Sequence, residues 1–296
     1  MTIRPSDIGA HRFGHQAMAT EFEIFAVHAG REYAQQAAWA AFDLLDRMES
    51  ELSRFIENSD ISRINALAAG ESARVNRWTM ECLEIARLAY AETGGAFDIS
   101  LGTGLESLQL APRHLTVRAT AGGVRLDLGG IGKGYAVDRM AEVLRDWDVH
   151  QALIHGGCSS VLAMDAPAGF EGWPMTLSDP AGEPFGTVIA SHQTYSASGI
   201  RKGDHILDPR TGKPVRRRLA AWATGDLDCG GLWASASPSA VAEAFSTAFM
   251  ILPAREVADL CERFPGLEAW LLDPASEPIH IISKQTRMTT CARKSD

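Results

Sequence analysis

Hydrophobic residues along this chain recur with two different periods, and each period predicts a different element. Between residues 31 and 52 the apolar positions recur every three or four residues, which is the spacing of one buried helix face. These positions are Ala34, Ala38, Ala41, Leu45, Met48 and Leu52. Residues 20–27, TEFEIFAV, alternate in part between apolar and polar side chains, as a half-buried strand does. We therefore expect a strand at Thr20–Val27 and a helix at Arg31–Leu52.

Cap and stop signals predict further helices. Asn76 is a typical helix-capping residue, and Gly94-Gly95 follows as a stop signal. Pro238 stands at the first turn of a later apolar stretch, where proline is tolerated. The expected helices are residues 76–92, 134–147, 239–252 and 254–264.

Short apolar or alternating stretches predict the remaining strands, and these do not alternate strictly with the helices. The expected strands are residues 124–128, 151–155, 160–164, 175–178, 187–191, 220–224, 267–272 and 279–282. Residues 53–65 are polar and predict a turn region. This mixed order favours an α+β fold in which helices pack on an antiparallel sheet.

Composition and charge narrow the class of protein. The chain has 296 residues, of which 46% are hydrophobic and 22% charged, and its net charge is −9. These values are typical of a globular protein, and the negative charge argues against a nucleic-acid binder, which would be basic. The five cysteines form no C-x-x-C pair, which indicates reduced thiols. No stretch has the pattern of a signal peptide or a membrane span. We expect a cytoplasmic protein, or an exported one if a signal preceded this sequence.

One stretch, RLDLGGIGKGYAVD at residues 125–138, places four glycines and Lys133 after a short apolar run. Glycine lets a backbone approach a ligand closely, and backbone amides at a turn before a helix form anion sites. The spacing fits neither a P-loop nor a dinucleotide-binding fingerprint. On this stretch alone, a phosphate-binding turn and a tight turn without a ligand both remain open.

Glu243 and Thr247 are four residues apart on an expected helix, so they share one face. A carboxylate and a hydroxyl on one face can together bind Mg²⁺, which prefers oxygen ligands and leaves room for phosphate. The alternative is an exposed glutamate beside a buried threonine that bonds its own backbone.

Three more stretches carry candidate chemistry, each with a structural alternative. TYSASG, residues 194–199, offers hydroxyls and a close backbone approach, or forms an ordinary loop. His205 begins HILDPRTG, where it can move a proton beside a phosphate, or serves only as a structural residue. GGAFD, residues 94–98, lines a site, or forms a helix C-cap with Phe97 in the core.

The order of these motifs is more informative than any one of them. Along the chain they are Met18-Ala19-Thr20, SRFIENSDISRIN (53–65), GGAFD (94–98), DLGGIGKGYAVD (127–138), HGGCSS (155–160), SASG (196–199), HILDPRTG (205–212) and AEAFSTA (242–248). This series resembles the FAD:protein FMN transferases, the flavin transferases once called thiamine-biosynthesis lipoproteins. The resemblance covers about residues 17 to 252.

The resemblance implies a fold and an activity. The fold is a single α+β domain of the thiamine-synthesis-lipoprotein type, with FAD in a cleft between two lobes. We expect this domain at residues 17–285, after an N-terminal extension (1–16) and before a C-terminal tail (286–296). The activity is Mg²⁺-dependent transfer of FMN from FAD to a threonine hydroxyl of a target protein, with release of AMP. The implied partners are FAD and that acceptor protein.

Site residues follow from the family motifs, position by position. The resemblance implies FAD contacts at Met18, Phe55, Ala96, Phe97, Asp98, Asp127, Lys133, Ser196, Ser198, Gly199 and His205. It implies metal ligands at Gly130, through its carbonyl, and at Glu243 and Thr247. His205 and Lys133 are the candidate catalytic residues, for proton handling and for positive potential near the phosphates.

Two departures from the family pattern bear on function. Glu243 stands where the family has a metal-binding aspartate, one methylene shorter, and Mg²⁺ geometry is strict. Only IRKGD separates SASG from HILDP, where the family has a longer strand-rich insertion. Two alternatives therefore stay open. One is an FAD pyrophosphatase that releases free FMN, and the other is an FAD-binding protein without catalysis.

Overall fold

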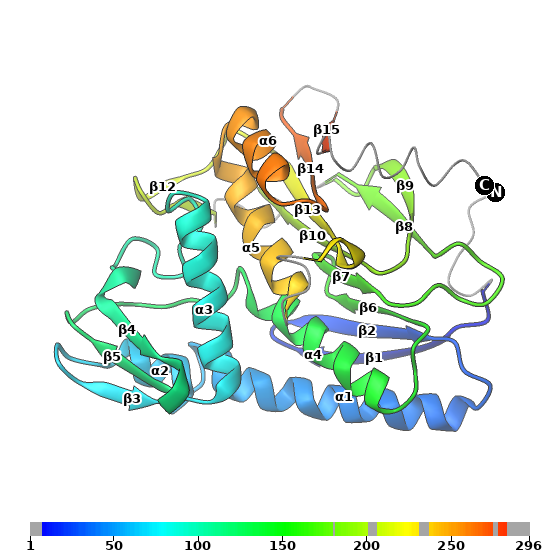
Figure 1. The fold of residues 1–296 in the computed structure, drawn as a ribbon, viewed down its shortest axis with the longest axis horizontal. Coiled ribbons are helices and arrows are strands. Elements are labelled where there is room, and N and C mark those ends of the chain that lie inside the picture. Colours follow the sequence, from blue (N-terminus) through cyan, green and yellow to red (C-terminus); the bar gives the residue numbers. More distant parts are fainter. Residues whose placement is uncertain (1–7, 180, 201–205, 231–236, 275–277, 283–296) are drawn as a thin grey trace.

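An eight-stranded antiparallel sheet forms the centre of the molecule. The computed structural model describes residues 8–179, 181–200, 206–230, 237–274 and 278–282. Every neighbouring strand pair in the sheet is antiparallel (Figure 1). In spatial order the strands are β1 (His11–Ala17), β2 (Thr20–Ala26), β6 (Ala152–Gly156), β7 (Ser160–Ala163), β10 (Gln193–Gly199), β13 (Ala220–Asp226), β14 (Leu267–Leu272) and β15 (Ile279–Ile282). The predicted α+β class is confirmed.

Alternating side chains give the sheet two different faces. Phe22 and Ile24 of β2 enter the main core, which also holds the buried faces of the helices. Phe25, the next residue after Ile24, points to the other face and packs against a second cluster with Trp173 and Ala190. Period-two alternation along a strand produces this division. The helix-covered face carries α1 (Arg31–Leu52), α4 (Gly132–Asp146) and α5 (Pro238–Ile251), and the second cluster holds β8 (Trp173–Ser178) and β9 (Pro184–Ala190).

A small three-stranded sheet and two helices form a second lobe, visible at one end of Figure 1. Its elements are α2 (Asp60–Asn65), β3 (Ser72–Arg74), α3 (Arg77–Glu92), β4 (Leu108–Ala111) and β5 (Thr116–Ala119). The buried carboxylate of Asp60 accepts bonds from Asn76 N (2.5 Å) and Thr79 Oγ1 (2.7 Å). Asp60 thereby ties α2 to the start of α3.

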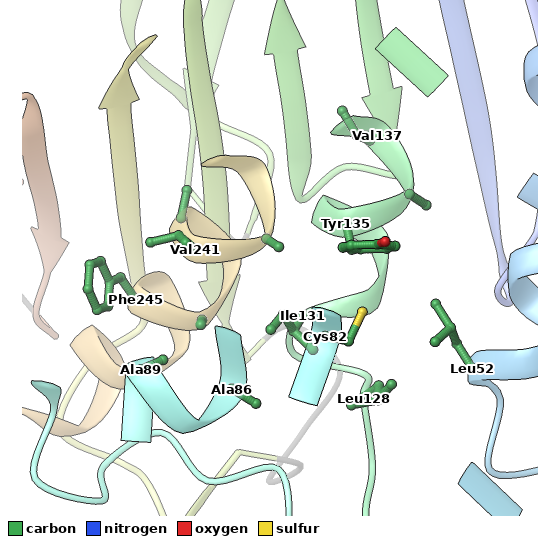
Figure 2. Packing of buried hydrophobic residues seen from close by; sticks show 14 of the residues in the cluster. Leu52, Cys82, Ala86, Ala89, Leu128, Ile131, Tyr135, Val137, Val241 and Phe245 are labelled. Carbon is green, nitrogen blue, oxygen red and sulfur yellow. The ribbon is translucent and has the colours of Figure 1, made fainter. Parts of the chain in front are cut away.

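The helices are the best-predicted elements. The predicted helix at 31–52 is confirmed, and the side chain of Asn76 caps α3 by accepting a bond from Trp78 N. Gly94 and Gly95 end that helix with positive φ angles of 58° and 75°, a conformation that glycine adopts readily. The other three predicted helices correspond to α4, α5 and α6 (Ala254–Arg263). Figure 2 shows α3, α4, α5 and the end of α1 meeting around Cys82, Ile131, Tyr135, Val241 and Leu52.

Two local predictions were wrong because side chains form hydrogen bonds that the local sequence pattern did not predict. Residues 53–65 are not only a turn, since Ser59 caps the short helix α2 by accepting a bond from Ser62 N (3.0 Å). Residues 124–128 belong to no strand. The side chain of Asn65 bonds both backbone groups of Leu126, at 2.6 Å and 3.0 Å, in the manner of a neighbouring strand.

The sheet also contains residues that were expected elsewhere. TYSASG is not a loop, because it forms most of β10, paired with β7 and β13. Strand β1 begins at His11 and pairs with β2 along its length. Part of the stretch expected as an N-terminal extension therefore belongs to the sheet. The predicted tail, 286–296, lies outside the described residues.

Candidate functional site

The glycine-rich turn begins where the extended segment 124–128 ends. Asp127 Oδ1 accepts a bond from Gly129 N at 2.8 Å, which folds the chain back on itself. Gly130 then lies beside two predicted site residues. A Cβ at Gly130 would stand 3.1 Å from the ring of Phe97 and 3.5 Å from Thr247 Oγ1. The turn therefore brings the GGAFD motif and helix α5 to one place.

The buried carboxylate of Glu243 joins the turn to α5. Glu243 Oε2 accepts a bond from Gly134 N at 2.7 Å, within the first turn of α4. Its other oxygen, Oε1, forms an ion pair with Lys133 Nζ. The same ammonium donates to the carbonyl of Gly129 at 3.0 Å. Lys133 is thus held between a carboxylate oxygen and a carbonyl oxygen.

Thr247 lies one helical turn after Glu243 and is part of a network of hydroxyl groups. Its Oγ1 donates to the carbonyl of Glu243 (3.2 Å) and lies 3.1 Å from Ser198 Oγ. Ser198 Oγ also bonds Ser246 Oγ at 2.9 Å. Ser196 Oγ bonds the carbonyl of Ser159 at 3.0 Å. These small side chains let β10 pack closely on α5 and place hydroxyl groups beside the turn.

Helices α4 and α5 cap each other across a close contact. A Cβ at Gly134 would lie 2.3 Å from the carbonyl oxygen of Ser239 and 2.8 Å from Ala240 N, so only glycine fits there. On α4, the carboxylate of Asp138 accepts bonds from the amides of Ser239 (3.0 Å) and Ala240 (3.2 Å). In return Glu243, on α5, caps α4. Burial raises the pKa of Asp138 to about 7, although the bonds from Ser239 act to lower it.

The rim of the site carries an exposed aromatic ring. Arg54 Nε pairs with Asp127 Oδ2 at 2.9 Å, and its guanidinium lies 4.2 Å from the centre of the Phe55 ring. Phe55 is 80% exposed. The ring is therefore available to stack on a planar ligand, as the resemblance implies.

Asp98 has a different environment from that of a free ligand-binding carboxylate. Its oxygens accept bonds from Ser100 N (2.7 Å), Ser100 Oγ (2.9 Å) and Gly102 N (2.8 Å). Phe97 is buried, as the structural alternative for this motif expected. Asp98 thus shapes the loop that follows it.

Most of the predicted site residues belong to one chain of contacts. In order, the contacts connect Phe55, Arg54, Asp127, Gly129, Lys133, Glu243, Thr247 and Ser198, with Phe97 beside Gly130. Ala96 is buried next to Phe97, and Gly199 follows Ser198 at the end of β10. Met18 is half-buried at the β1–β2 turn, with φ 49°. His205 lies outside the described residues.

Sequence reasoning missed Gly134 and Asp138 as organising residues. Both lie in the quoted glycine-rich stretch, and their i, i+4 spacing places them on one helix face. Two expectations, one for the glycine-rich stretch and one for Glu243, also change. The amides of Gly129 and Gly134 bond to carboxylates of the protein. Glu243 is 3% exposed, so the exposed-glutamate alternative is wrong, whereas Thr247 does bond its own backbone.

A cavity of about 460 Å³ lies between the ends of α3 and α6. None of the predicted site residues lines it. Its arginines are paired within the protein, because Arg263 bonds Glu92 (2.8 Å) and Arg210 bonds Asp208 (2.9 Å). We therefore place the candidate site at the glycine-rich turn.

The donor groups at the turn are those that suit a hard divalent cation. Among the described residues, no group of three or more histidine, cysteine or acidic side chains could hold a metal ion. The turn instead offers one carboxylate, one hydroxyl and main-chain carbonyls, the oxygen types that Mg²⁺ prefers. The ammonium of Lys133 already occupies a cation position between Glu243 Oε1 and Gly129 O. These oxygen types fit a hard divalent cation.

Comparison with known proteins gives the family. The ApbE family profile matches residues 18–114 and 102–271. The chain belongs to the ApbE family. One relative, an FAD:protein FMN transferase of Treponema pallidum, is 26% identical, over 79% of this chain and 76% of that protein. Another with the same name, from Klebsiella pneumoniae, is 26% identical, over 68% of this chain and 75% of that protein.

Solved structures of the family share the fold. The flavin transferase ApbE of Vibrio cholerae superposes with a TM-score of 0.78 at 17% identity, covering 94% of this chain and 99% of that one. The apo flavinyl transferase ApbE of Pseudomonas stutzeri gives 0.78 at 20% identity, covering 94% and 96%. The family prediction is thereby confirmed. Among the described residues, no helix has the length and apolar character needed to cross a membrane.

Proposed function

We propose that this ApbE-family chain transfers FMN from FAD to a threonine hydroxyl of an acceptor protein, with release of AMP and dependence on Mg²⁺. The observation that carries the proposal is the convergence of Lys133, Glu243, Thr247 and the glycine-rich turn at one place. The names of its relatives, FAD:protein FMN transferases, support the same activity.

Each residue of the site has a role that its contacts support. Glu243, Thr247 and the carbonyl of Gly130 would hold the divalent cation, which when bound neutralises phosphate charge and polarises the phosphoryl oxygens. Lys133 adds a positive charge beside them. The exposed ring of Phe55 would stack on an aromatic group of FAD. His205 remains the candidate for handling the hydroxyl proton.

An acceptor-labelling experiment tests the activity. The protein is incubated with FAD, Mg²⁺ and an acceptor protein that carries the family's threonine motif, and intact mass is measured. We expect the acceptor to gain the mass of one FMN. The same reaction distinguishes the alternatives. A pyrophosphatase would release free FMN with an unmodified acceptor, and a non-catalytic binding protein would leave FAD intact at every Mg²⁺ or Mn²⁺ concentration.

Substitution of Thr247 tests the role of the α5 face. Thr247→Ala removes one hydroxyl next to the turn, so we expect turnover to fall far more than FAD affinity. Thr187→Ala, on the exposed side of β9, is the matched control and should change neither quantity. Equal losses of turnover and FAD affinity in Thr247→Ala would contradict a metal-centred role.

The cellular location of the protein and the bounds of its domain are also proposals. We propose a transferase domain at 17–285, preceded by the paired residues of β1. The cytoplasmic location rests on cysteine usage, and Cys82, Cys158 and Cys261 are free thiols in the structure.

A further inference from the structure

Lys133 contacts Glu243, a residue that the proposed function assigns to a metal ion. Its ammonium pairs with Glu243 Oε1 and donates to Gly129 O at 3.0 Å. The Glu243 side chain is 4% exposed and the Lys133 side chain 20% exposed. A carboxylate this deeply buried requires a cationic partner. Lys133 provides it.

Only one oxygen of Glu243 is available for exchange between partners. Glu243 Oε2 is committed to Gly134 N at 2.7 Å, where it caps α4. Oε1 can therefore bind an ammonium or a metal ion, but it cannot bind both as closely as it binds either one alone. A divalent ion entering beside a bound ammonium would also experience repulsion at close range, which is weakly screened in a buried site.

We propose that Lys133 is the resident cation of this site, and that a divalent ion binds well only when substrate phosphates draw the ammonium away from Glu243. This inference rests on the proposed function, because the phosphates are those of FAD. A lysine ammonium on a flexible four-carbon stem can move to a phosphate without moving the backbone. Metal and dinucleotide then bind with positive coupling, each raising the affinity for the other.

Metal binding measured without turnover tests this inference. The probes are Mn²⁺, followed by the electron paramagnetic resonance of the free ion, and ADP, which carries a pyrophosphate but no flavin to transfer. In the wild-type protein we expect weak Mn²⁺ binding alone, and binding about tenfold or more tighter with ADP, after correction for Mn²⁺–ADP in solution. Equal affinity with and without ADP would overturn the proposal without any variant.

Substitutions then assign the effect to Lys133. Lys133→Met should bind Mn²⁺ alone about tenfold or more tightly than the wild-type protein, and ADP should add less. Lys133→Arg keeps the charge and should keep the weak binding. Arg145→Met removes the same charge from an exposed position of α4, twelve residues and about 18 Å along the helix, and should resemble the wild-type protein.

A second substitution locates the ion. Glu243→Gln combined with Lys133→Met should abolish the gain in Mn²⁺ affinity, because the carboxylate that faces Lys133 is lost. A Lys133→Met protein that binds Mn²⁺ no better than the wild-type protein would refute the role of Lys133. These results do not depend on the acceptor assay. If ADP tightens Mn²⁺ binding but no acceptor is labelled, the transferase proposal fails, whereas the proposal that Lys133 is the resident cation is supported.

Discussion

Gly134 provides a sharp test of how α4 and α5 are joined. A Cβ at this position would lie 2.3 Å from Ser239 O, 2.5 Å from Ser239 C and 2.8 Å from Ala240 N, all of which are backbone atoms. Ordinary contact begins near 3.4 Å, so Gly134→Ala must push the start of α5 away by about 1 Å. No flexible side chain can absorb this shift.

The expected cost of Gly134→Ala has two parts. Overpacking of a close backbone contact costs about 1–3 kcal/mol. The shift also lengthens the bonds that Glu243 and Asp138 make across the contact, and a hydrogen bond to a charged group contributes about 1.5–3 kcal/mol. Alanine is more favourable than glycine in a helix by about 0.5–1 kcal/mol, which offsets part of this cost. We expect a net loss of about 2–5 kcal/mol in the free energy of unfolding.

Gly132 is the matched control, two residues earlier in the same helix. A Cβ there would lie 3.9 Å from its nearest contact, Leu128 Cβ. Gly132→Ala should therefore be neutral or stabilise the protein by up to about 1 kcal/mol. Urea denaturation followed by circular dichroism measures both variants. If Gly134→Ala were as stable as Gly132→Ala, the close contact and the reciprocal caps would not hold the helices together.

Two further substitutions test the caps and the β1–β2 turn. Because burial raises the pKa of Asp138 to about 7, the folded state keeps a proton that the unfolded chain has lost above its ordinary value of 3.8. The free energy of unfolding should therefore fall as pH rises between these values, by up to about 1.4 kcal/mol per pH unit, and level off above pH 7. Denaturation of the wild-type and Asp138→Asn proteins at pH 5, 6, 7 and 8 measures this dependence. The same pH dependence in both proteins would contradict the prediction. At the hairpin turn, Ala19 has φ 56°, where a non-glycine residue costs about 1 kcal/mol. Ala19→Gly should raise the free energy of unfolding by about 0.5–1 kcal/mol, whereas Ala17→Gly, in the strand, should lower it; a destabilised Ala19→Gly would show that the turn is not strained.

Local signals explain which parts of the fold the sequence predicts. Asn76 and the glycine pair after α3 act within a few residues of themselves, so the helix they bound is predictable. Strand β10 is different, because serine and glycine are also loop formers. Its strand partners and its hydroxyl partner Ser246 lie 21 to 50 positions away. Long-range partners of this kind leave no trace in the local pattern.

The candidate site likewise has features that the sequence predicts and features that it does not. The shared face of Glu243 and Thr247 follows from their spacing alone. The partners of Glu243 do not, because Lys133 and Gly134 are 110 and 109 residues away in the sequence. The anion-site reading of the glycine-rich turn changes for this reason. Two of its amides bond carboxylates of the protein, so negative charge lies at the turn and a cation is needed to balance it.

The two oxygens of Glu243 separate helix docking from ligand exchange. Oε2 stays on Gly134 N and maintains the α4–α5 contact, whether Oε1 faces Lys133 or another cation. The carboxylate of Asp138 supports the same contact from the opposite helix. A change of cation therefore requires a lysine side chain to move, but not the helices. This division explains how a deeply buried carboxylate can serve both the fold and the site.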